Sequence, residues 1–379
     1  MLTAQDERLE ALSRWLEGQT AVTGLDLTTV TPASADASFR RYFRVQGEGA
    51  TYIVMDAPPE KEPIDSFLKV DALMKNAGLN VPEILASDAE QGFILMSDLG
   101  RQTYLDVLNE DNAARLMDAA TDALVKWQAA SKPGVLPEYD YAVLRREIDL
   151  FPEWYVGRHR GYTLTEKQSE IIEGVYEKII ASCLAQPKVF VHRDFMPRNL
   201  MVSDPMPGVL DFQDALYGPV TYDIASLMRD AFISWGESFV LDITIRYWDK
   251  ARKAGIPVPQ DFGEFWREVE WMGIQRHLKV LGIFARINYR DGRPKYLEDT
   301  PRFLHYVRET ANRYNELKPI NWLLDQFEEQ KTKVGHTEKD GDSTDARDGA
   351  CRRPRLSAAA FDRYDSKATA AGGRRRAPV

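Results

Sequence analysis

The sequence predicts an α+β protein with two lobes, a small, mostly antiparallel β lobe followed by a mainly helical lobe. Two observations carry this prediction. Short runs rich in aromatic and β-branched residues, separated by turn residues, fill much of the first 98 residues, whereas helical periodicity dominates from about residue 103. We therefore expect an N-terminal lobe over 1–98 and a C-terminal lobe over 99–330.

The first lobe begins with a helix whose leucines recur at helical spacing, and a hairpin around the turn sequence QGEGA comes next. A second helix follows, with Gly78 as its C-cap, and two more strands close the lobe. In chain order, the expected elements are a helix at 4–17, strands at 38–45 and 51–57, a helix at 65–78, and strands at 81–88 and 92–100.

The second lobe is mostly helical, but short strands return in its middle. The run KVFVH and the two arms around SDPMPG have strand composition, and long helical patterns surround them. The expected elements are helices at 111–130 and 165–185, strands at 188–192, 199–202 and 208–212, and helices at 221–235, 237–254, 260–288 and 300–316.

The last part of the chain, residues 331–379, has a different composition. Its large apolar residues are only Val334, Leu356, Phe361, Tyr364 and Val379. Such a segment cannot bury enough apolar surface to offset an ordering entropy of ~1–2 kcal/mol per residue. We expect a disordered tail and assign it no function.

Charge and composition exclude some classes of protein. The net charge is -9, whereas nucleic-acid binders are usually basic, so we expect no nucleic-acid partner. The sequence has no apolar run of about 18 residues and no signal-peptide pattern at its start, so we expect no membrane partner. Cys183 and Cys351 fit no metal or redox spacing. These observations favour a cytoplasmic protein, which we expect to be a monomer.

One segment, residues 191–214, carries the chemistry. Its start, VHRDFMPRN, matches the kinase catalytic-loop spacing H-R-D-x-x-x-x-N. We assign the catalytic roles to Asp194 and His192, with Asp194 accepting or orienting the proton of a substrate hydroxyl. The expected hairpin then folds Asp211 back beside Asn199, and their hard oxygen ligands suit Mg²⁺.

The same segment resembles the aminoglycoside phosphotransferase superfamily, the choline-kinase-like branch of the protein-kinase fold. Gln213 stands where protein kinases have the glycine of D-F-G, and no activation segment follows it. Instead, GPVTYDIASLMRD at 218–230 is similar to the G-D-P-x-x-D-L-A segment of that superfamily. The resemblance implies a two-lobed protein-kinase-like fold, ATP as phosphate donor and Mg²⁺ as cofactor. It also implies that Asp223 begins a helix and braces the catalytic loop.

Other segments narrow the resemblance. SDLG at 97–100, LFPEWYVGRH at 150–159, HRDFMPRNLM and DFQDALYGPVTYD are together similar to the anomeric amino-sugar kinases of bacterial peptidoglycan recycling. This resemblance, and no argument from spacing, implies that the acceptor is the anomeric hydroxyl of N-acetylmuramate and N-acetylglucosamine.

The nucleotide-binding lobe departs from the kinase pattern. TPASADAS at 31–38 stands in the place of the glycine-rich loop, where small side chains such as Ser38 would still let the backbone approach a phosphate. Met55 stands at the position of the strand-three lysine. The adenine is expected at the hinge from Met96 to Asp98, bound by backbone groups.

An arginine on the preceding strand is a candidate to replace the missing lysine, because its planar fork binds phosphate through two hydrogen bonds. Strand alternation places Arg41 on the same face as Phe43 and Val45, so we select Arg41 over Arg40 and Arg44. Two alternatives stay open: all three arginines are solvated or paired with acids, or they bind the substrate.

The acceptor pocket is the least specific part of the prediction. Trp154 offers an apolar face for a sugar, and Arg276, with His277 and Arg286 nearby, offers a positive charge for a carboxylate. Core packing for Trp154 and a solvated basic face for the arginines are the alternatives. Asp214 is a candidate substrate or second metal ligand, or a simple cap.

Three functional hypotheses result. The first is a sugar 1-kinase for N-acetylmuramate and N-acetylglucosamine. The second is a kinase of the same fold for another acceptor, such as an aminoglycoside, an amino alcohol or a different sugar. The third is a pseudokinase binding module, suggested by the missing lysine and glycine-rich loop. The intact Asp194, Asn199 and Asp211 argue against the third.

Overall fold

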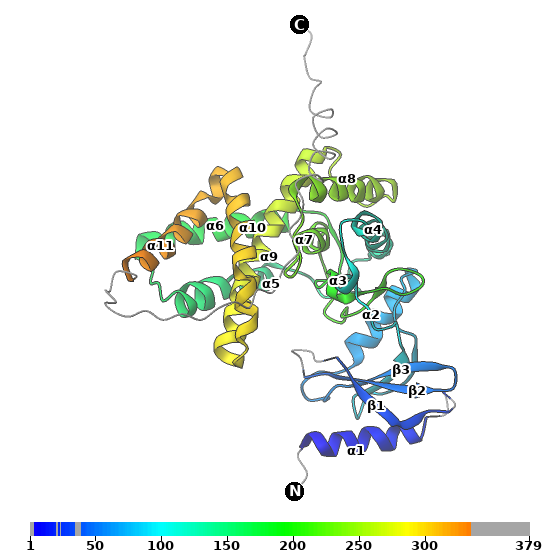
Figure 1. Ribbon diagram of the computed structural model, residues 1–379. Coiled ribbons are helices and arrows are strands. Elements are labelled where there is room, and N and C mark those ends of the chain that lie inside the picture. Colours follow the sequence, from blue (N-terminus) through cyan, green and yellow to red (C-terminus); the bar gives the residue numbers. More distant parts are fainter. Residues whose placement is uncertain (1–3, 20–21, 23, 35–38, 335–379) are drawn as a thin grey trace, which may run out of the picture.

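The computed structural model describes residues 4–19, 22, 24–34 and 39–334. It has the two-lobed α+β architecture that the sequence predicts (Figure 1). A twisted sheet and two helices form the N-terminal end of the molecule, and a group of helices forms the rest.

The N-terminal sheet has five strands in the order β1-β2-β3-β5-β4, and all neighbours are antiparallel. The strands are β1 (Asp26–Ser34), β2 (Arg41–Gly47), β3 (Ala50–Asp56), β4 (Ile84–Asp88) and β5 (Phe93–Ser97). The expected hairpin is confirmed as β2–β3, which turns between Gly47 and Ala50. Strand β1 was not predicted. It is an edge strand without a buried residue, so the sequence there has no alternating apolar pattern.

Both faces of the sheet are covered by helices. On one face, α1 (Ala4–Glu17) packs Leu12 and Leu16 against Phe43 of β2 in a small separate core. On the other face, α2 (Asp65–Asn76) belongs to the main core, which continues into the helical lobe. The face toward α2 therefore also forms one wall of the space between the lobes.

The helical lobe is built around α9 (Phe262–Asp291), which packs against several of its neighbours. The other helices are α3 (Tyr104–Val107), α4 (Ala113–Ala129), α5 (Tyr141–Ile148), the π-helix η1 (Phe151–His159), α6 (Glu166–Leu184), the 3₁₀ turns η2 (Pro197–Asn199), η3 (Pro294–Asp299) and η4 (Asn315–Leu317), α7 (Tyr222–Met228), α8 (Glu237–Lys253), α10 (Thr300–Arg313) and α11 (Lys318–Val334). Helices α5, η1 and α11 were not predicted.

Two boundaries differ from the sequence expectation. Helix α7 ends at Met228 rather than near residue 235. Asp230 accepts hydrogen bonds from the N–H groups of Phe232 (2.8 Å) and Ile233 (3.0 Å), a local turn that competes with the helix. Helix α11 runs past the expected boundary at residue 330, and the rest of the expected tail, 335–379, lies outside the described residues.

Two short ladders position the segment between α6 and α7. Strand β6 (Lys188–Val191) pairs with β9 (Leu216–Pro219), and β7 (Leu200–Met201) pairs with β8 (Gly208–Val209). The catalytic-loop segment leaves β6, and the chain returns through β9. The intervening loop is therefore held at both ends.

Candidate active site

His192 is a structural anchor of the catalytic loop. The ring is fully buried, and its Nε2–H donates to the carbonyl of Leu210 (2.9 Å), while its Nδ1 accepts from the N–H of Asp194 (3.1 Å). Burial lowers the pKa of His192 to about 4, so the ring is neutral at ordinary pH. Since both nitrogens are occupied, our assignment of a catalytic role to His192 is corrected: it positions Asp194 and joins the loop to the β7–β8 hairpin.

Asp223 braces the same loop from α7. Its carboxylate is fully buried and accepts hydrogen bonds from the backbone N–H groups of His192 (2.7 Å) and Arg193 (3.0 Å). The role implied by the family resemblance is therefore present in the geometry. Burial raises the pKa of Asp223 to about 7, and the two donated hydrogen bonds oppose that rise.

The backbone is strained at two points of this site. Arg193 (φ 78°) and Asp211 (φ 59°) are the only non-glycine residues with positive φ in the described part of the chain. Such conformations cost about 1–3 kcal/mol each and cluster at functional sites. Both residues lie beside a candidate catalytic group, so the strain marks the loop and the hairpin end as one functional unit.

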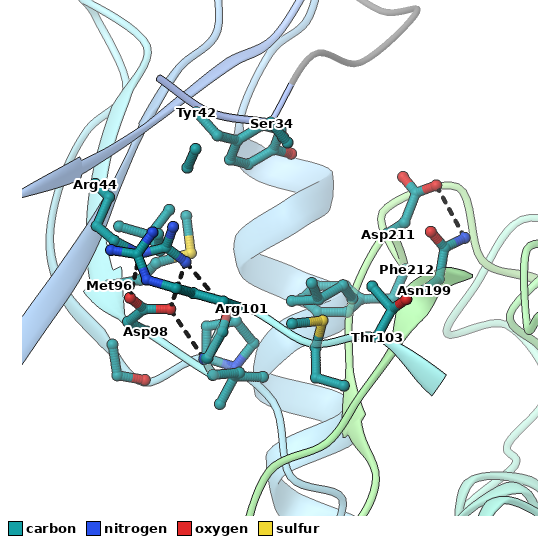
Figure 2. Close-up of a pocket in the computed structure, with 18 of the residues that line it drawn as sticks. Ser34, Tyr42, Arg44, Met96, Asp98, Arg101, Thr103, Asn199, Asp211 and Phe212 are labelled. Atoms are coloured by element: carbon teal, nitrogen blue, oxygen red, sulfur yellow. Dashed lines mark hydrogen bonds and ion pairs between the residues drawn. The ribbon is translucent and has the colours of Figure 1, made fainter. Parts of the chain in front are cut away.

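Asn199 and Asp211 meet as the sequence predicts. The β7–β8 hairpin returns the chain, and Asn199 Nδ2 lies 3.3 Å from Asp211 Oδ2 and 2.8 Å from the carbonyl of Asp194 (Figure 2). Gln213 donates to Asp211 Oδ1 at 2.8 Å. Because Asn199 uses its Nδ2 for both bonds, its Oδ1 is the atom left for a cation. An amide oxygen beside a carboxylate fits a hard divalent cation.

Asp194 lies in a strongly charged environment. Burial raises its pKa above the ordinary value, and the positive charge of Lys279 is the largest effect that opposes the rise. Arg193 and Arg276 act in the same direction as Lys279, whereas the exposed Asp214 raises the pKa further. A carboxylate with a raised pKa beside a cleft is typical of a group that exchanges protons.

Glu147 of α5 organises these charges. It is buried and pairs with Arg193 (2.6 Å) and Lys279 (2.8 Å), and it accepts a hydrogen bond from Tyr139. Lys279 also donates to the hydroxyl of Tyr222 at 3.1 Å. Sequence analysis missed this cluster, because Glu147 and Lys279 match no motif and their elements are far from the catalytic loop in the sequence.

A cleft of about 430 Å³ separates the lobes. Figure 2 shows Arg44, Met96 and Asp98 at one side and Asn199, Asp211 and Phe212 at the other. The remaining wall is largely apolar, and Phe67 of α2 packs on Phe212 with ring centroids 4.9 Å apart. The two hinge residues named by sequence analysis, Met96 and Asp98, both line this cleft.

Of the three arginines considered on β2 and just before it, Arg44 is the one that lines the cleft. It is buried and forms a two-pronged ion pair with Asp98 (2.6 and 3.1 Å), and it also donates to the carbonyl of Gly100 (3.1 Å). Thr51 donates to the same carboxylate at 2.7 Å. This cluster fixes the hinge segment against β2, so the side chain of Asp98 has a structural partner in the protein itself.

Arg41 lies on the opposite face of the sheet. Its Nε donates to Asp56 at 2.9 Å, and Arg8 of α1 contacts the same fully buried carboxylate at 2.8 Å. Our selection of Arg41 as a phosphate ligand is therefore wrong in its geometry. Alternation correctly grouped Arg41 with Phe43, but that face packs on α1 and not on the cleft.

The remaining candidate site residues do not come together at the cleft in the described part of the chain. Ser38 lies outside the described residues. Trp154 is half-buried in η1 with the guanidinium of Arg158 5.6 Å from its ring, and it does not line the cleft. Arg276 is only 3% exposed and donates to the carbonyl of Arg229 (3.3 Å). Because Arg276 is buried, it is not an exposed ligand for a substrate. It acts on the site through its charge.

Comparison with known proteins shows the family of this chain. The model of the phosphotransferase enzyme family matches residues 29–257. This range includes strands β2 to β5 of the sheet, the catalytic loop and α7. The chain belongs to the phosphotransferase enzyme family. The predicted fold and the predicted class of enzyme are thereby confirmed.

Curated relatives of this phosphotransferase are N-acetylmuramate/N-acetylglucosamine kinases. The protein from Pseudomonas aeruginosa is 52% identical over 331 residues, which cover 85% of this chain and 97% of the relative. The protein from Neisseria meningitidis is 50% identical over 324 residues, which cover 84% of this chain and 95% of the relative.

Solved structures share the fold at low identity. The choline kinase LicA from Streptococcus pneumoniae matches with a TM-score of 0.57 and 14% identity, over 81% of this chain and 99% of that protein. A crystal structure described as an aminoglycoside phosphotransferase from Ralstonia eutropha matches with a TM-score of 0.56 and 14% identity, over 82% and 98%. Among the described helices, none is both long enough and apolar enough to span a bilayer.

The charge around Asp194 predicts a pH dependence. Its carboxylate must be ionised to accept a proton, so kcat/KM should rise with pH through a pKa above the ~3.9 of an ordinary aspartate. Lys279→Met removes the largest opposing charge and should move this acidic limb to higher pH. The limb should not move in Lys253→Met, which changes an exposed lysine of α8. A limb that moves to lower pH in the Lys279 variant would contradict the assignment.

Proposed function

We propose that this phosphotransferase moves the γ-phosphate of ATP, with Mg²⁺, to the anomeric hydroxyl of N-acetylmuramate and N-acetylglucosamine. The observation that carries the proposal is the identity of 50–52% to three kinases named for these two sugars, each matched over 95–97% of its length. The anomeric position rests on the resemblance to the anomeric amino-sugar kinases, and it is chemically reasonable because that hydroxyl is the most acidic of the ring.

Asp194 accepts the proton of the sugar hydroxyl in this proposal. Support comes from its raised pKa and from the bonds that fix its loop to Leu210 and Asp223. Proton transfer of this kind contributes roughly 10²–10⁴ in rate. In phosphoryl transfer the proton leaves late, so a carboxylate is a sufficient base.

Asn199 and Asp211 would hold the Mg²⁺ ion. Such an ion would neutralise negative charge on the transferring phosphoryl group. Mg²⁺ is usually bound by one or two protein ligands together with substrate phosphates, which agrees with a pair of ligands at the edge of the cleft. Two points support Mg²⁺ in this proposal: the family to which the chain belongs, and the oxygen ligands that Asn199 and Asp211 offer.

The nucleotide would occupy the cleft of about 430 Å³, with its base at the hinge near Met96. Ile53, Met96 and Phe67 are among the apolar residues that line the cleft, which suits a flat base. Asp98 would act through the backbone of its segment, because Arg44 occupies its carboxylate. Asp214 is an exposed carboxylate whose charge acts on Asp194, and in this proposal it contacts the acceptor.

We also propose that the enzyme acts as a monomer in the cytoplasm. The cytoplasmic location is supported by the low cysteine content, two cysteines among 379 residues, one of them the buried Cys183, whereas the monomeric state stays a prediction. Trp154 as a sugar-binding surface stays a prediction.

An acceptor panel tests the proposal. ADP release should be observed with N-acetylglucosamine and N-acetylmuramate, and kcat/KM for glucose should be far lower. Both sugars carry an N-acetyl group, and a site built to bond that group rejects an analogue without it by up to roughly 10⁴–10⁵. Similar kcat/KM values for glucose and N-acetylglucosamine would show that the acceptor has been misassigned.

A further inference from the structure

The cleft lacks the cation that kinases place on their third strand. Met55 stands at that position in β3, and its side chain is fully buried in the main core and does not line the cleft. The transferring phosphoryl group carries negative charge, which must be stabilised by positive charge or by hydrogen-bond donors. Because β3 offers no cation here, positive charge for the transferring group must come from elsewhere in the cleft.

Most basic side chains near the site are already neutralised. Arg44 is paired with Asp98, and Arg193 and Lys279 share Glu147. Arg41 lies on the far face of the sheet, bonded to Asp56. A guanidinium that already pairs with a buried carboxylate would have to break that pair to bind phosphate, which costs several kcal/mol.

Arg198 differs from these residues. It lines the cleft, and its neighbour in the chain is the candidate metal ligand Asn199. Within the part of the chain that the structure describes, no carboxylate forms an ion pair with it. Its one recorded contact is the ring of Phe232, whose centroid lies 5.6 Å from the guanidinium carbon.

The backbone of Arg198 is well fixed. It occupies the 3₁₀ turn η2, between the buried Pro197 and Asn199, and the N–H of Asn199 donates to the carbonyl of Met196 at 2.9 Å. Phe232 belongs to the segment after α7, on the side of the helical lobe. The side chain therefore lies between the nucleotide cleft and the segment that follows α7.

We propose that Arg198 binds the γ-phosphoryl group during transfer and supplies positive charge to a cleft whose third strand has no lysine. This inference rests on the proposed function, since it assumes a nucleoside triphosphate in the cleft. Stacking on Phe232 holds the guanidinium in one plane, and its N–H groups donate to the non-bridging oxygens of the phosphoryl group. An arginine supplied in the same chain is a known way to stabilise this transition state.

The step balances without any further reactant. The bond between the γ-phosphorus and the bridging oxygen of ADP breaks, and a bond from the same phosphorus to the sugar oxygen forms. The proton of the sugar hydroxyl passes to Asp194. Arg198 keeps all its protons and contributes only charge and hydrogen bonds.

Two other assignments compete with this one. Arg101 also lines the cleft, but it follows Gly100 in the hinge and is exposed, whereas Arg198 adjoins Asn199. A cation at the acceptor side could instead bind the carboxylate that distinguishes N-acetylmuramate from N-acetylglucosamine. The two sugars separate this second alternative from the proposal, because only one of them carries that group.

The test uses steady-state kinetics of Arg198→Met and Arg198→Lys with both sugars. Arg198→Met should lower kcat by roughly 10²–10³, the effect of removing one group that stabilises a transition-state charge, and the ratio should be the same for both sugars. Arg198→Lys should recover part of the loss. Arg252→Met is the matched control, because Arg252 also stacks on an aromatic ring, 4.6 Å from Trp248, but lies on α8.

Binding measurements keep the test independent of the acceptor. The Kd for ADP should be nearly unchanged in Arg198→Met, which also shows that the variant folds. The Kd for ADP with aluminium fluoride, a mimic of the transferring phosphoryl group, should rise at least tenfold.

An unchanged kcat, a loss confined to N-acetylmuramate, or a kcat loss found in Arg101→Met instead would each overturn the role of Arg198. A wild-type enzyme that phosphorylates neither sugar would contradict the proposed function, while the aluminium fluoride comparison would still decide the role of Arg198.

Discussion

Asp194→Asn is expected to lower kcat by roughly 10²–10⁴, because the amide cannot accept the proton of the sugar hydroxyl. The protein should fold normally. Burial already raises the pKa of Asp194, so a neutral side chain of the same shape removes a charge that the fold disfavours. The melting temperature should therefore be equal to or higher than that of the wild type, and ADP binding should be retained.

Two measurements check this result. Single-turnover phosphorylation separates the chemical step from product release, and the loss should appear in that step. Asp249→Asn, which changes an exposed partner of Lys253 on α8, is the control and should leave the rate unchanged. If Asp194→Asn kept more than about a tenth of the wild-type activity, general-base catalysis by Asp194 would be excluded.

The second large effect concerns the pair of candidate metal ligands. Asn199→Ala and Asp211→Ala should each lower kcat by roughly 10²-fold or more, and each should raise the Mg²⁺ concentration needed for half-maximal rate. Their side chains contact each other at 3.3 Å, so the two variants disturb one cluster. The double variant should lose much less than the product of the two single losses.

A double-mutant cycle at several Mg²⁺ concentrations measures this coupling. Excess Mg²⁺ should restore part of the activity of each single variant, because weaker binding is offset by mass action. Fully multiplicative losses that do not respond to Mg²⁺ would show that Asn199 and Asp211 do not share a metal.

The catalytic core could be predicted from the sequence because its residues are close in the chain. The spacing from His192 to Asn199 fixes one loop, and a hairpin with its turn at SDPMPG can only bring Asp211 back to the same end. Local turn chemistry therefore determines that arrangement. The spacing alone could not show that His192 is fully buried with both ring nitrogens bonded.

The nucleotide side was harder to predict because both faces of the sheet are covered. Alternation shows that Arg41 and Phe43 share a face and that Arg44 lies on the other. It does not show which face packs on α1 and which faces the cleft. The partner that identifies the outer face is Asp56, a buried carboxylate at the end of β3.

The charges around Asp194 depend on long-range packing. Glu147 and Lys279 are 132 positions apart in the sequence and meet only because α5 packs on α9. No local pattern in either helix indicates that contact. Arg198 is different, since it lies inside the recognised loop. The sequence could not show that it lacks a carboxylate partner within the described residues, because ion pairing depends on the packing of distant elements.

The most direct test of the central claim is the position of the phosphate on the product. The wild-type enzyme is incubated with ATP, Mg²⁺ and N-acetylglucosamine, and the product is examined by proton and phosphorus NMR. The account predicts a sugar 1-phosphate, with the anomeric proton split by phosphorus and the phosphate lost on mild acid treatment. A phosphate on O6, with an unsplit anomeric proton, would contradict transfer to the anomeric hydroxyl.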